Sequence, residues 1–353
     1  MTEALPEPVL IVGCGLIGTS VALALRGHDI DVFLEDARPG NVELAVSRGA
    51  GKPDSVDNPG LVVVAVPPAS VVDAVADALT KWPDAIVTDV ASVKDDLGIS
   101  IGELPGASRY VGSHPMAGSE RSGPMAASAH LFEGRAWAVT AEPHTEARAV
   151  DAVRLLATLV GAVIVDMDAR THDEAVALVS HLPHLLSVLA AAQLNGAPEG
   201  HMALAGPGLR DVTRIAGSDA GLWLEILQGN AGKVKALLEN VRGDLDSLIT
   251  GLDSDANAIA SVLRRGREGT RLVPGRHGDK DVEMATVFVQ IPDRPGELSL
   301  LMAHTGESGI NIEDIRIDHE LGRPVGLVEV AVAAHNAEAL VDALTDRGWS
   351  AYR

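Results

Sequence analysis

The chain has 353 residues, of which 46% are hydrophobic, so it can bury more than one core and is expected to form two or three domains. Its 49 acidic and 28 basic residues give a formal net charge of −21, which argues against nucleic acid and anionic membrane surfaces as partners. An anionic small substrate would need local arginine or histidine side chains to hold it.

Cys14 is the only cysteine in the sequence, so an intramolecular disulfide and a multi-cysteine metal site are excluded. Residues 1–8 are acidic and proline-containing, unlike a targeting segment, and no apolar run approaches the ~20 residues that span a bilayer. We therefore expect a cytoplasmic protein with no membrane partner and no metal.

The first 166 residues alternate short apolar runs with helix-patterned stretches. Runs at 9–12, 32–34, 61–66 and 85–88 come first, and further strands are predicted at 110–112, 136–140 and 162–165. The run at 61–66 is apolar throughout, which is typical of a parallel sheet covered by helices on both faces. This α/β pattern predicts a Rossmann-type domain over residues 1–166.

A glycine fingerprint, GCGLIG at residues 13–18, follows the first predicted strand and opens a helix. Its glycines suit a tight turn, close approach of a pyrophosphate and close packing of the helix on the strand. This context favours dinucleotide binding over a purely structural loop. The predicted cofactor-binding residues are Gly13, Gly15, Leu16, Ile17, Gly18, Asp36, Val66 and Pro67.

Asp36 lies near the end of the second predicted strand, where a carboxylate can accept hydrogen bonds from ribose hydroxyls and repel a 2′-phosphate. NAD is therefore predicted in preference to NADP. Glu35 is an alternative for the same role, and Arg38 could soften the discrimination. A solvated charge at a strand end is the other interpretation of Asp36.

Beyond residue 166 the sequence becomes rich in alanine and leucine, with helical periodicity at 169–195, 208–216 and 221–265. We predict an all-α second domain over 167–265 and a linker over 266–283, where apolar residues are scarce. Residues 284–353 follow a βαββαβ order, with strands at 285–291, 311–318 and 325–331, helices at 295–307 and 337–347 and a last short strand, which predicts a ferredoxin-like domain. The apolar periodicity of the helical domain exceeds what one exposed layer needs, so a homodimer is expected.

His114 lies in a glycine-bounded loop, GSHPMAGSE at 112–120, downstream of the dinucleotide-binding unit. An imidazole there could accept a hydroxyl proton while a nicotinamide takes a hydride, which indicates oxidation of an alcohol. The alternative is a loop histidine that bonds its own turn.

His181 and His184 are three residues apart and would share one face of a helix, although Pro183 should kink or end the helix there. A metal pair and a polar core contact are both open interpretations, but no HExxH pattern accompanies the pair.

Arg214 stands in an otherwise apolar helix-like segment, and its planar guanidinium matches a carboxylate bidentately. In this acidic chain it is the leading candidate for the local positive charge. An internal salt bridge with Asp211 or Asp219 is the alternative.

Over nearly its whole length, the chain resembles the prephenate dehydrogenases of tyrosine biosynthesis. Five motifs carry this resemblance: GCGLIG at 13–18, DVASVK at 89–94, GSHPMAGSE at 112–120, HLPH at 181–184 and RDVTRIA at 210–216. The resemblance implies NAD-dependent oxidative decarboxylation of prephenate to 4-hydroxyphenylpyruvate. It implies that His114 is the base, that Ser92 helps to orient it, and that His184 and Arg214 bind substrate carboxylates. The further substrate contacts are His181, Ser113 and Gly118.

The tail, with DRPGEL at 293–298 and GINI at 309–312, resembles an ACT module, which commonly binds an amino acid at the junction of paired domains. This resemblance implies an amino-acid effector, for which tyrosine is our hypothesis, held by Asp293, Gly296, Asn311 and Ile312. A module used only for dimerisation is the alternative.

Three other functions stay open. An arogenate dehydrogenase acts on a substrate with an amino group in place of the keto group, and His184 favours the keto acid. A β-hydroxyacid dehydrogenase shares the fingerprint and a helical domain but typically uses a lysine base and lacks the 112–120 loop. A non-catalytic amino-acid sensor could use NAD as a structural ligand. The presence of His114, Ser92 and Arg214 argues against this function.

Overall fold

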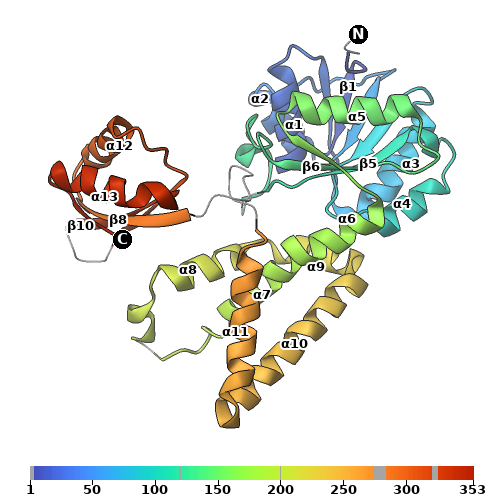
Figure 1. Cartoon of the computed structure of the whole chain (residues 1–353). Helices are drawn as coiled ribbons and strands as arrows, with labels where there is room; N and C mark the ends of the chain where they lie inside the picture. Colours follow the sequence, from blue (N-terminus) through green and yellow to red (C-terminus); the bar gives the residue numbers. More distant parts are fainter. Residues whose placement is uncertain (1–3, 119–120, 199, 274–283, 320–324) are drawn as a thin grey trace. The chain divides into compact units, whose positions relative to one another are not determined.

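The computed structural model describes residues 4–118, 121–198, 200–273, 284–319 and 325–353. The chain divides into two compact units, residues 1–242 and 243–353, and each has its own internal packing. Figure 1 shows the elements of both units.

A seven-stranded sheet forms the centre of the first unit (Figure 1). In the spatial order β2-β1-β3-β4-β5-β6-β7, its strands are Val32–Glu35, Val9–Val12, Leu61–Val64, Ile86–Asp89, Tyr110–Pro115, Ala136–Thr140 and Val163–Asp166. Strands β1 to β5 run parallel, as predicted, whereas β6 is antiparallel to β5 and β7 is parallel to β6. The reversal occurs because the described part of the β5–β6 connection holds a short turn, Pro124–Ala126, and no crossover helix.

Helices cover both faces of this sheet. One core packs β1 and β3 against α1 (Leu16–Arg26), α2 (Pro39–Ser47) and α5 (Ala147–Leu159). The other core packs the opposite face against α3 (Val71–Lys81) and α4 (Asp95–Gly102). Two-sided burial explains why the central strands are apolar throughout. Strand β3 ends at Val64, two residues before the predicted end, and the backbone bends at Val66.

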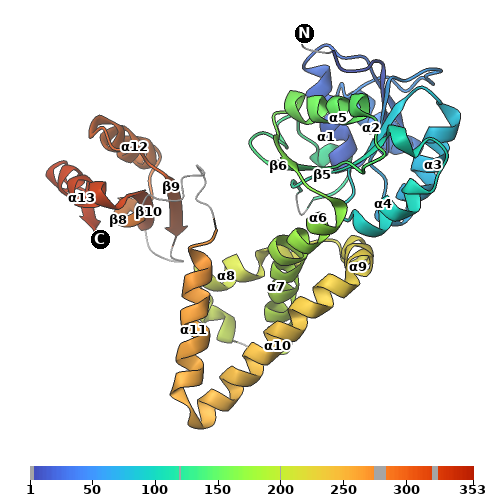
Figure 2. The same cartoon turned by 45° about the vertical axis from the view of Figure 1, so that its right-hand side comes forward.

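Helix α6 (Ala169–Val176) continues into α7 (Leu182–Ala192) through a π-helical segment, Ala177–His181. Figures 1 and 2 both show this helix leaving the sheet domain. Pro183 was expected to kink or end the helix. The helix instead continues, because the π segment places Pro183 at the start of α7, where a missing N–H is tolerated.

The combined helix Ala169–Ala192 is long and apolar enough, by length and composition, to cross a membrane, contrary to the expectation from the apolar runs alone. A single helix of this kind is weak support for a membrane span, and this one carries the buried polar side chains of His172, Asp173, His181 and His184. Its exposed apolar side chains are Leu178, Val179, Leu186, Val188 and Leu189.

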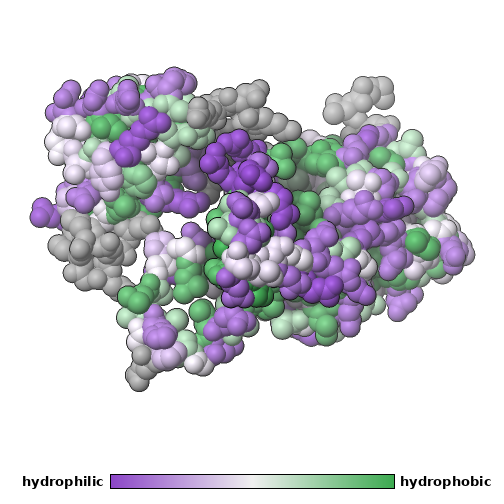
Figure 3. All heavy atoms as spheres, turned by 60° about the horizontal axis from the view of Figure 1, so that its bottom comes forward, coloured by the Kyte–Doolittle hydropathy of each residue, from purple (hydrophilic) through white to green (hydrophobic). Residues whose placement is uncertain are grey.

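Three further helices begin in the first unit: α8 (Pro207–Thr213), α9 (Ala220–Gly229) and α10 (Ala231–Ser254). Asp219 caps α9 by accepting a hydrogen bond from the Leu222 backbone N–H at 2.8 Å. Hydrophobic side chains lie exposed among hydrophilic ones in Figure 3. Those on the helices of the first unit include Val212, Leu222 and Leu224.

In the second unit, α11 (Ala256–Thr270) continues past residue 265 into the segment predicted as a linker. The helix tolerates Gly266 and Gly269 at a cost of about 1 kcal/mol each relative to alanine. Residues 271–273 follow the helix, and residues 274–283 lie outside the described residues.

The four-stranded antiparallel sheet has the order β11-β8-β10-β9, with strands Ser350–Tyr352, Met284–Pro292, Val325–Ala333 and Asp314–His319. Helices α12 (Glu297–Glu307) and α13 (Ala337–Asp346) pack against it around Leu301, Leu340 and Leu344. The predicted βαββαβ order is present.

Candidate active site

The glycine loop of residues 13–18 joins β1 to α1. Gly13 has φ +103°, and a Cβ on it would lie 2.4 Å from the Ala65 carbonyl oxygen. A Cβ on Gly18 would lie 2.0 Å from the Gly13 carbonyl oxygen, whereas nothing lies within 4 Å of a Cβ on Gly15. The fold therefore requires Gly13 and Gly18, while Gly15 leaves open space at the uncapped N-terminus of α1, where Leu16 and Ile17 begin the helix. That space fits the pyrophosphate of a dinucleotide.

Asp36 directly follows β2 and faces this loop. Its Oδ2 accepts a hydrogen bond from the Cys14 backbone N–H at 2.7 Å. Its Oδ1 accepts from the Arg38 backbone N–H at 2.7 Å and from the Asn41 amide at 3.2 Å. These bonds hold the carboxylate beside the loop, whereas Glu35, the alternative acid, is exposed. Val66 and Pro67 follow Ala65 after the end of β3, the strand next to β1.

His114 lies on β5 and is only 8% exposed. Its Nδ1 is 2.9 Å from His172 Nε2, and no hydrogen bond joins its Nε2 to another described residue. Burial, followed by repulsion from His172, Lys94 and His181, holds the pKa of His114 well below its usual value. At neutral pH the imidazole is therefore uncharged and can accept a proton.

A buried polar cluster lies at the β4 and β5 ends beside His114. The ammonium of Lys94 pairs with the Asp89 carboxylate, and the Tyr110 hydroxyl donates to Asp89 Oδ1 at 2.7 Å. Burial lowers the pKa of Lys94, and Asp89 opposes that shift. Ser113, a predicted substrate contact, is fully buried and donates to the Asp89 carbonyl oxygen at 2.7 Å, so its hydroxyl is committed to the sheet.

Ser92 and Gly118 flank this region on two loops. Ser92 follows β4, is half-buried and makes no side-chain hydrogen bond with a described residue, so its hydroxyl is available to a ligand. Gly118 is exposed, with nothing within 4 Å of a Cβ placed on it. The end of its loop, at 119–120, lies outside the described residues.

His181 and His184, at the start of α7, both contact the ring of Trp223. His184 stacks on Trp223 of α9 with ring centroids 3.5 Å apart, and His181 meets that ring edge-on at 6.0 Å. Burial lowers the pKa of His181 to about 4 and also lowers that of His184. Both rings are therefore neutral at pH 7 and can donate hydrogen bonds to a ligand without carrying charge.

Among the described residues no group of three His, Cys, Asp or Glu side chains is arranged to hold a metal ion. Asn230 Nδ2 lies 3.3 Å from His181 Nδ1 and donates to the Asp173 carbonyl oxygen at 2.7 Å. The local geometry of His181 thus follows the polar-contact interpretation.

Arg214 opens a short turn, Arg214–Gly217, that packs against α7. It is exposed, and no ion pair or hydrogen bond joins its guanidinium to another described residue. Asp219, one of its two candidate partners, instead caps α9. The guanidinium is therefore available for an anionic ligand.

Sequence reasoning missed several residues that the fold brings to this site. Trp223 supports both histidines, and His172, Asp173 and Asn230 surround His114 and His181. No simple α-helical spacing links Asp173 to His184, because the π-helical segment Ala177–His181 lies between them.

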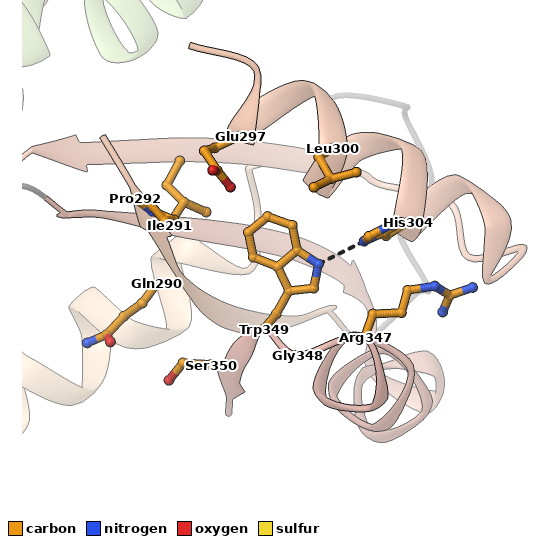
Figure 4. A pocket seen from close by; sticks show the side chains of 10 residues that line it. All are labelled: Gln290, Ile291, Pro292, Glu297, Leu300, His304, Arg347, Gly348, Trp349 and Ser350. Carbon is orange, nitrogen blue, oxygen red and sulfur yellow. Dashed lines mark hydrogen bonds between the residues drawn. The ribbon is translucent and has the colours of Figure 1, made fainter. Parts of the chain in front are cut away.

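The second unit holds a cavity of about 410 Å³ between α12 and the α13–β11 turn (Figure 4). Trp349 lines this cavity together with Leu300 and Ile291, and its Nε1–H donates a hydrogen bond to His304 Nδ1 at 2.9 Å. None of the four residues predicted to bind an effector lines this cavity. Gly296 has φ +96° and precedes α12, and Asn311 donates to Glu313 Oε1 at 2.8 Å.

The fold and the site define a class of protein. A glycine fingerprint, a carboxylate beside it and a buried neutral imidazole next to the same sheet are the parts of a nicotinamide-dependent oxidoreductase. Residues 21–166 match the nucleotide-binding domain of prephenate dehydrogenase, and residues 168–264 match its dimerization domain. The chain belongs to the prephenate dehydrogenase family and is an NAD-dependent oxidoreductase, which confirms the predicted enzyme class and cofactor.

Three similar proteins illustrate the range of the family. A probable prephenate dehydrogenase of Streptomyces niveus is 34% identical, over 97% of this chain and 98% of its own length. The structure of A. aeolicus prephenate dehydrogenase with hydroxyphenyl propionate and NAD⁺ has a TM-score of 0.69 and 26% identity, over 77% of this chain and all of that one. Synechocystis arogenate dehydrogenase has a TM-score of 0.61 and 26% identity, over 74% of this chain and 98% of that one.

Proposed function

We propose that the protein oxidises and decarboxylates prephenate to 4-hydroxyphenylpyruvate. The observation that carries this proposal is His114, a buried neutral imidazole whose Nε2 makes no bond with the described residues. Its Nε2 accepts the proton of the substrate's ring hydroxyl, while Ser92 orients that oxygen. When bound, NAD⁺ accepts the hydride from the ring carbon that carries this hydroxyl.

The two carboxylates of prephenate need hydrogen-bond donors, and the chain provides a charged donor and a neutral one. Arg214 supplies a bidentate charged fork, and neutral His184 supplies an N–H held in place by Trp223. His181, Gly118 and the backbone around Ser113 form the wall beside the ring. We assign Arg214 to the ring carboxylate, which leaves as CO₂ and loses its charge in the transition state. Arg214 therefore orients the substrate more than it lowers the barrier.

Arogenate is the second candidate substrate, because an arogenate dehydrogenase shares this fold. Its ammonium group needs acceptors, whereas the guanidinium of Arg214 can only donate, which favours the keto acid. The sensor alternative, in which NAD is only a structural ligand, predicts no turnover of either compound.

The direct assay follows NADH or NADPH at about 340 nm, with prephenate or arogenate as substrate and NAD⁺ or NADP⁺ as cofactor. We expect prephenate with NAD⁺ to give the highest kcat/KM of the four pairs, because Asp36 repels a 2′-phosphate. A higher kcat/KM with arogenate would reassign the substrate. Absence of turnover with all four pairs would remove the enzymatic function.

Residues 284–353 are proposed to form an ACT domain that binds tyrosine through Asp293, Gly296, Asn311 and Ile312, with feedback inhibition as the result. The sheet order β11-β8-β10-β9 and the left-handed Gly296 before α12 support this proposal. Tyrosine should raise the melting temperature more than phenylalanine or tryptophan does. Asn311→Ala should abolish that shift, whereas Arg347→Gln, at the Trp349 cavity, should leave it intact. Absence of a shift in the wild-type protein would leave the module a dimerisation device.

A homodimer is proposed through the helices of residues 167–265, in a protein of the cytoplasm. The match to a dimerization domain and the exposed apolar side chains of α7 and α9 support it. Sedimentation should give twice the mass of one chain. A monomer at micromolar concentration would contradict the proposal.

A further inference from the structure

His114 is the first member of a chain of three buried side chains. Its Nδ1 lies 2.9 Å from His172 Nε2, and His172 Nδ1 lies 2.8 Å from Asp173 Oδ1. His172 is 1% exposed and Asp173 is fully buried. These hydrogen-bonded side chains connect β5, which carries His114, to α6, which carries His172 and Asp173.

When His172 is neutral, the chemistry of Asp173 sets the direction of both hydrogen bonds among these three side chains. An ionised carboxylate can only accept, so His172 Nδ1 must donate to Asp173. A neutral imidazole carries one N–H, so His172 Nε2 is then an acceptor and His114 Nδ1 must donate to it. With its one proton on Nδ1, neutral His114 is left with a bare lone pair on Nε2.

Asp173 is held in its ionised state by groups from outside α6. Its two oxygens accept hydrogen bonds from the backbone N–H groups of Lys94 at 2.9 Å and Asp95 at 3.0 Å, at the start of α4. Burial raises the pKa of Asp173, but the hydrogen bonds from His172, Asp95 and Lys94 outweigh burial and lower it overall. Asp173 is therefore an acceptor throughout the working pH range, and it ties the loop of Ser92 to the imidazole of His114.

We propose that His172 and Asp173 are positioning residues that hold His114 in the tautomer with a free Nε2. This inference rests on the proposed role of His114 as the base. The substrate proton then goes to Nε2, and the resulting imidazolium keeps its Nδ1–H donated to His172. In the opposite tautomer Nε2 would already carry a proton, and His114 could not accept another at that atom.

The first test measures the tautomer itself and needs no turnover. Nitrogen NMR of the wild-type protein labelled with ¹⁵N-histidine, at pH 7.5 without ligand, reports which ring nitrogen of His114 is protonated. The His114 signal is assigned by its loss in His114→Asn. The proposal predicts a proton on Nδ1; a proton on Nε2 would overturn it, whatever the substrate of the enzyme proves to be.

The second test compares two substitutions of His172. Gln can place a carbonyl oxygen near the position of Nε2 and keep the acceptor for His114, whereas Leu cannot. We expect His172→Leu to lower kcat by roughly 10²-fold or more, with KM for prephenate and Kd for NAD⁺ within about threefold of wild type. His172→Gln should recover at least about tenfold of that loss.

Equal kcat in the two variants, or a wild-type kcat in His172→Leu, would contradict the positioning role. Wild-type turnover of prephenate is measured in the same series, so failure of the proposed function would be seen separately as an inactive wild-type enzyme. If His172→Leu does not fold, as judged by circular dichroism and NAD⁺ binding, the wild-type NMR measurement and His172→Gln still decide the question.

Discussion

His184 and Trp223 lie face to face, with their ring planes within 1° and their centroids 3.5 Å apart. The two rings come from α7 and α9, so the stack fixes His184, a proposed carboxylate ligand, against a second helix. His181 meets the same indole edge-on. Trp223 is therefore the common support of the two histidines.

Replacing Trp223 by Leu should weaken substrate binding, because His184 loses a stacking partner worth about 1 kcal/mol. We expect KM for prephenate to rise about fivefold, with a smaller change in kcat. Trp223→Phe is the matched control and should recover most of the KM, since a phenyl ring can stack in the same place. A fall in kcat with an unchanged KM would show that Trp223 acts in some other way.

Arg214→Ala should raise KM for prephenate far more than it lowers kcat, because we propose that the guanidinium orients a carboxylate that loses its charge in the transition state. Arg210→Ala, one helical turn earlier, is the control and should leave both constants near wild type. Steady-state kinetics in which Arg214→Ala mainly lowers kcat would reverse this assignment.

The glycine loop allows a paired test of fold against cofactor binding. A Cβ at Gly15 meets nothing within 4 Å, so Gly15→Ala should keep the melting temperature but weaken NAD⁺ binding, since the methyl enters the pyrophosphate space. A Cβ at Gly18 would meet the Gly13 carbonyl oxygen, so Gly18→Ala should lower the melting temperature itself. Calorimetric NAD⁺ affinity unchanged in Gly15→Ala would place the dinucleotide elsewhere.

The buried histidines predict how activity and stability depend on pH. His114 has a pKa well below 6.5, so the acid limb of the kcat/KM profile should fall below that value. The unfolded chain protonates its histidines near 6.5, whereas folded His181 does so at about 4. Between these values the unfolded state binds more protons, so the free energy of unfolding should decrease as pH falls from 6.5 to 4.

Urea unfolding between pH 8 and pH 4 checks the stability, and the kinetic profile is recorded only where circular dichroism shows folded protein. An acid limb centred at or above 6.5 would mean that His114 is not the titrating base. A stability that rises as pH falls below 6.5 would be incompatible with buried neutral histidines.

The sheet domain was largely predictable because its signals are local. Uniformly apolar runs result from burial on both faces, and the spacing from the glycine loop to Asp36 results from one strand–helix–strand unit. The reversal of β6 was not predictable, because it depends on the connection between β5 and β6 and not on the composition of β6 itself. The length of α11 was missed because Gly266 and Gly269 resemble a linker, although a helix can tolerate both.

The candidate site could be predicted only in part, because local motifs are visible in the sequence and long-range contacts are not. His114, His184 and Arg214 stand in recognisable motifs, but the partners of His114 come from a helix 58 residues further along the chain. Such long-range pairs leave no spacing signal. The π segment before Pro183 was also hidden, because the sequence shows the proline but not the extra residue in the turn that accommodates it.

The measurement that bears most directly on the role of His114 is the kcat of His114→Asn with prephenate and NAD⁺, taken together with its NAD⁺ affinity. Asparagine retains polarity but cannot take up the hydroxyl proton. We predict that kcat falls by roughly 10²–10⁴-fold while Kd for NAD⁺ stays within about threefold. A kcat within a few-fold of wild type, in a protein that still binds NAD⁺, would contradict the central role given to this imidazole.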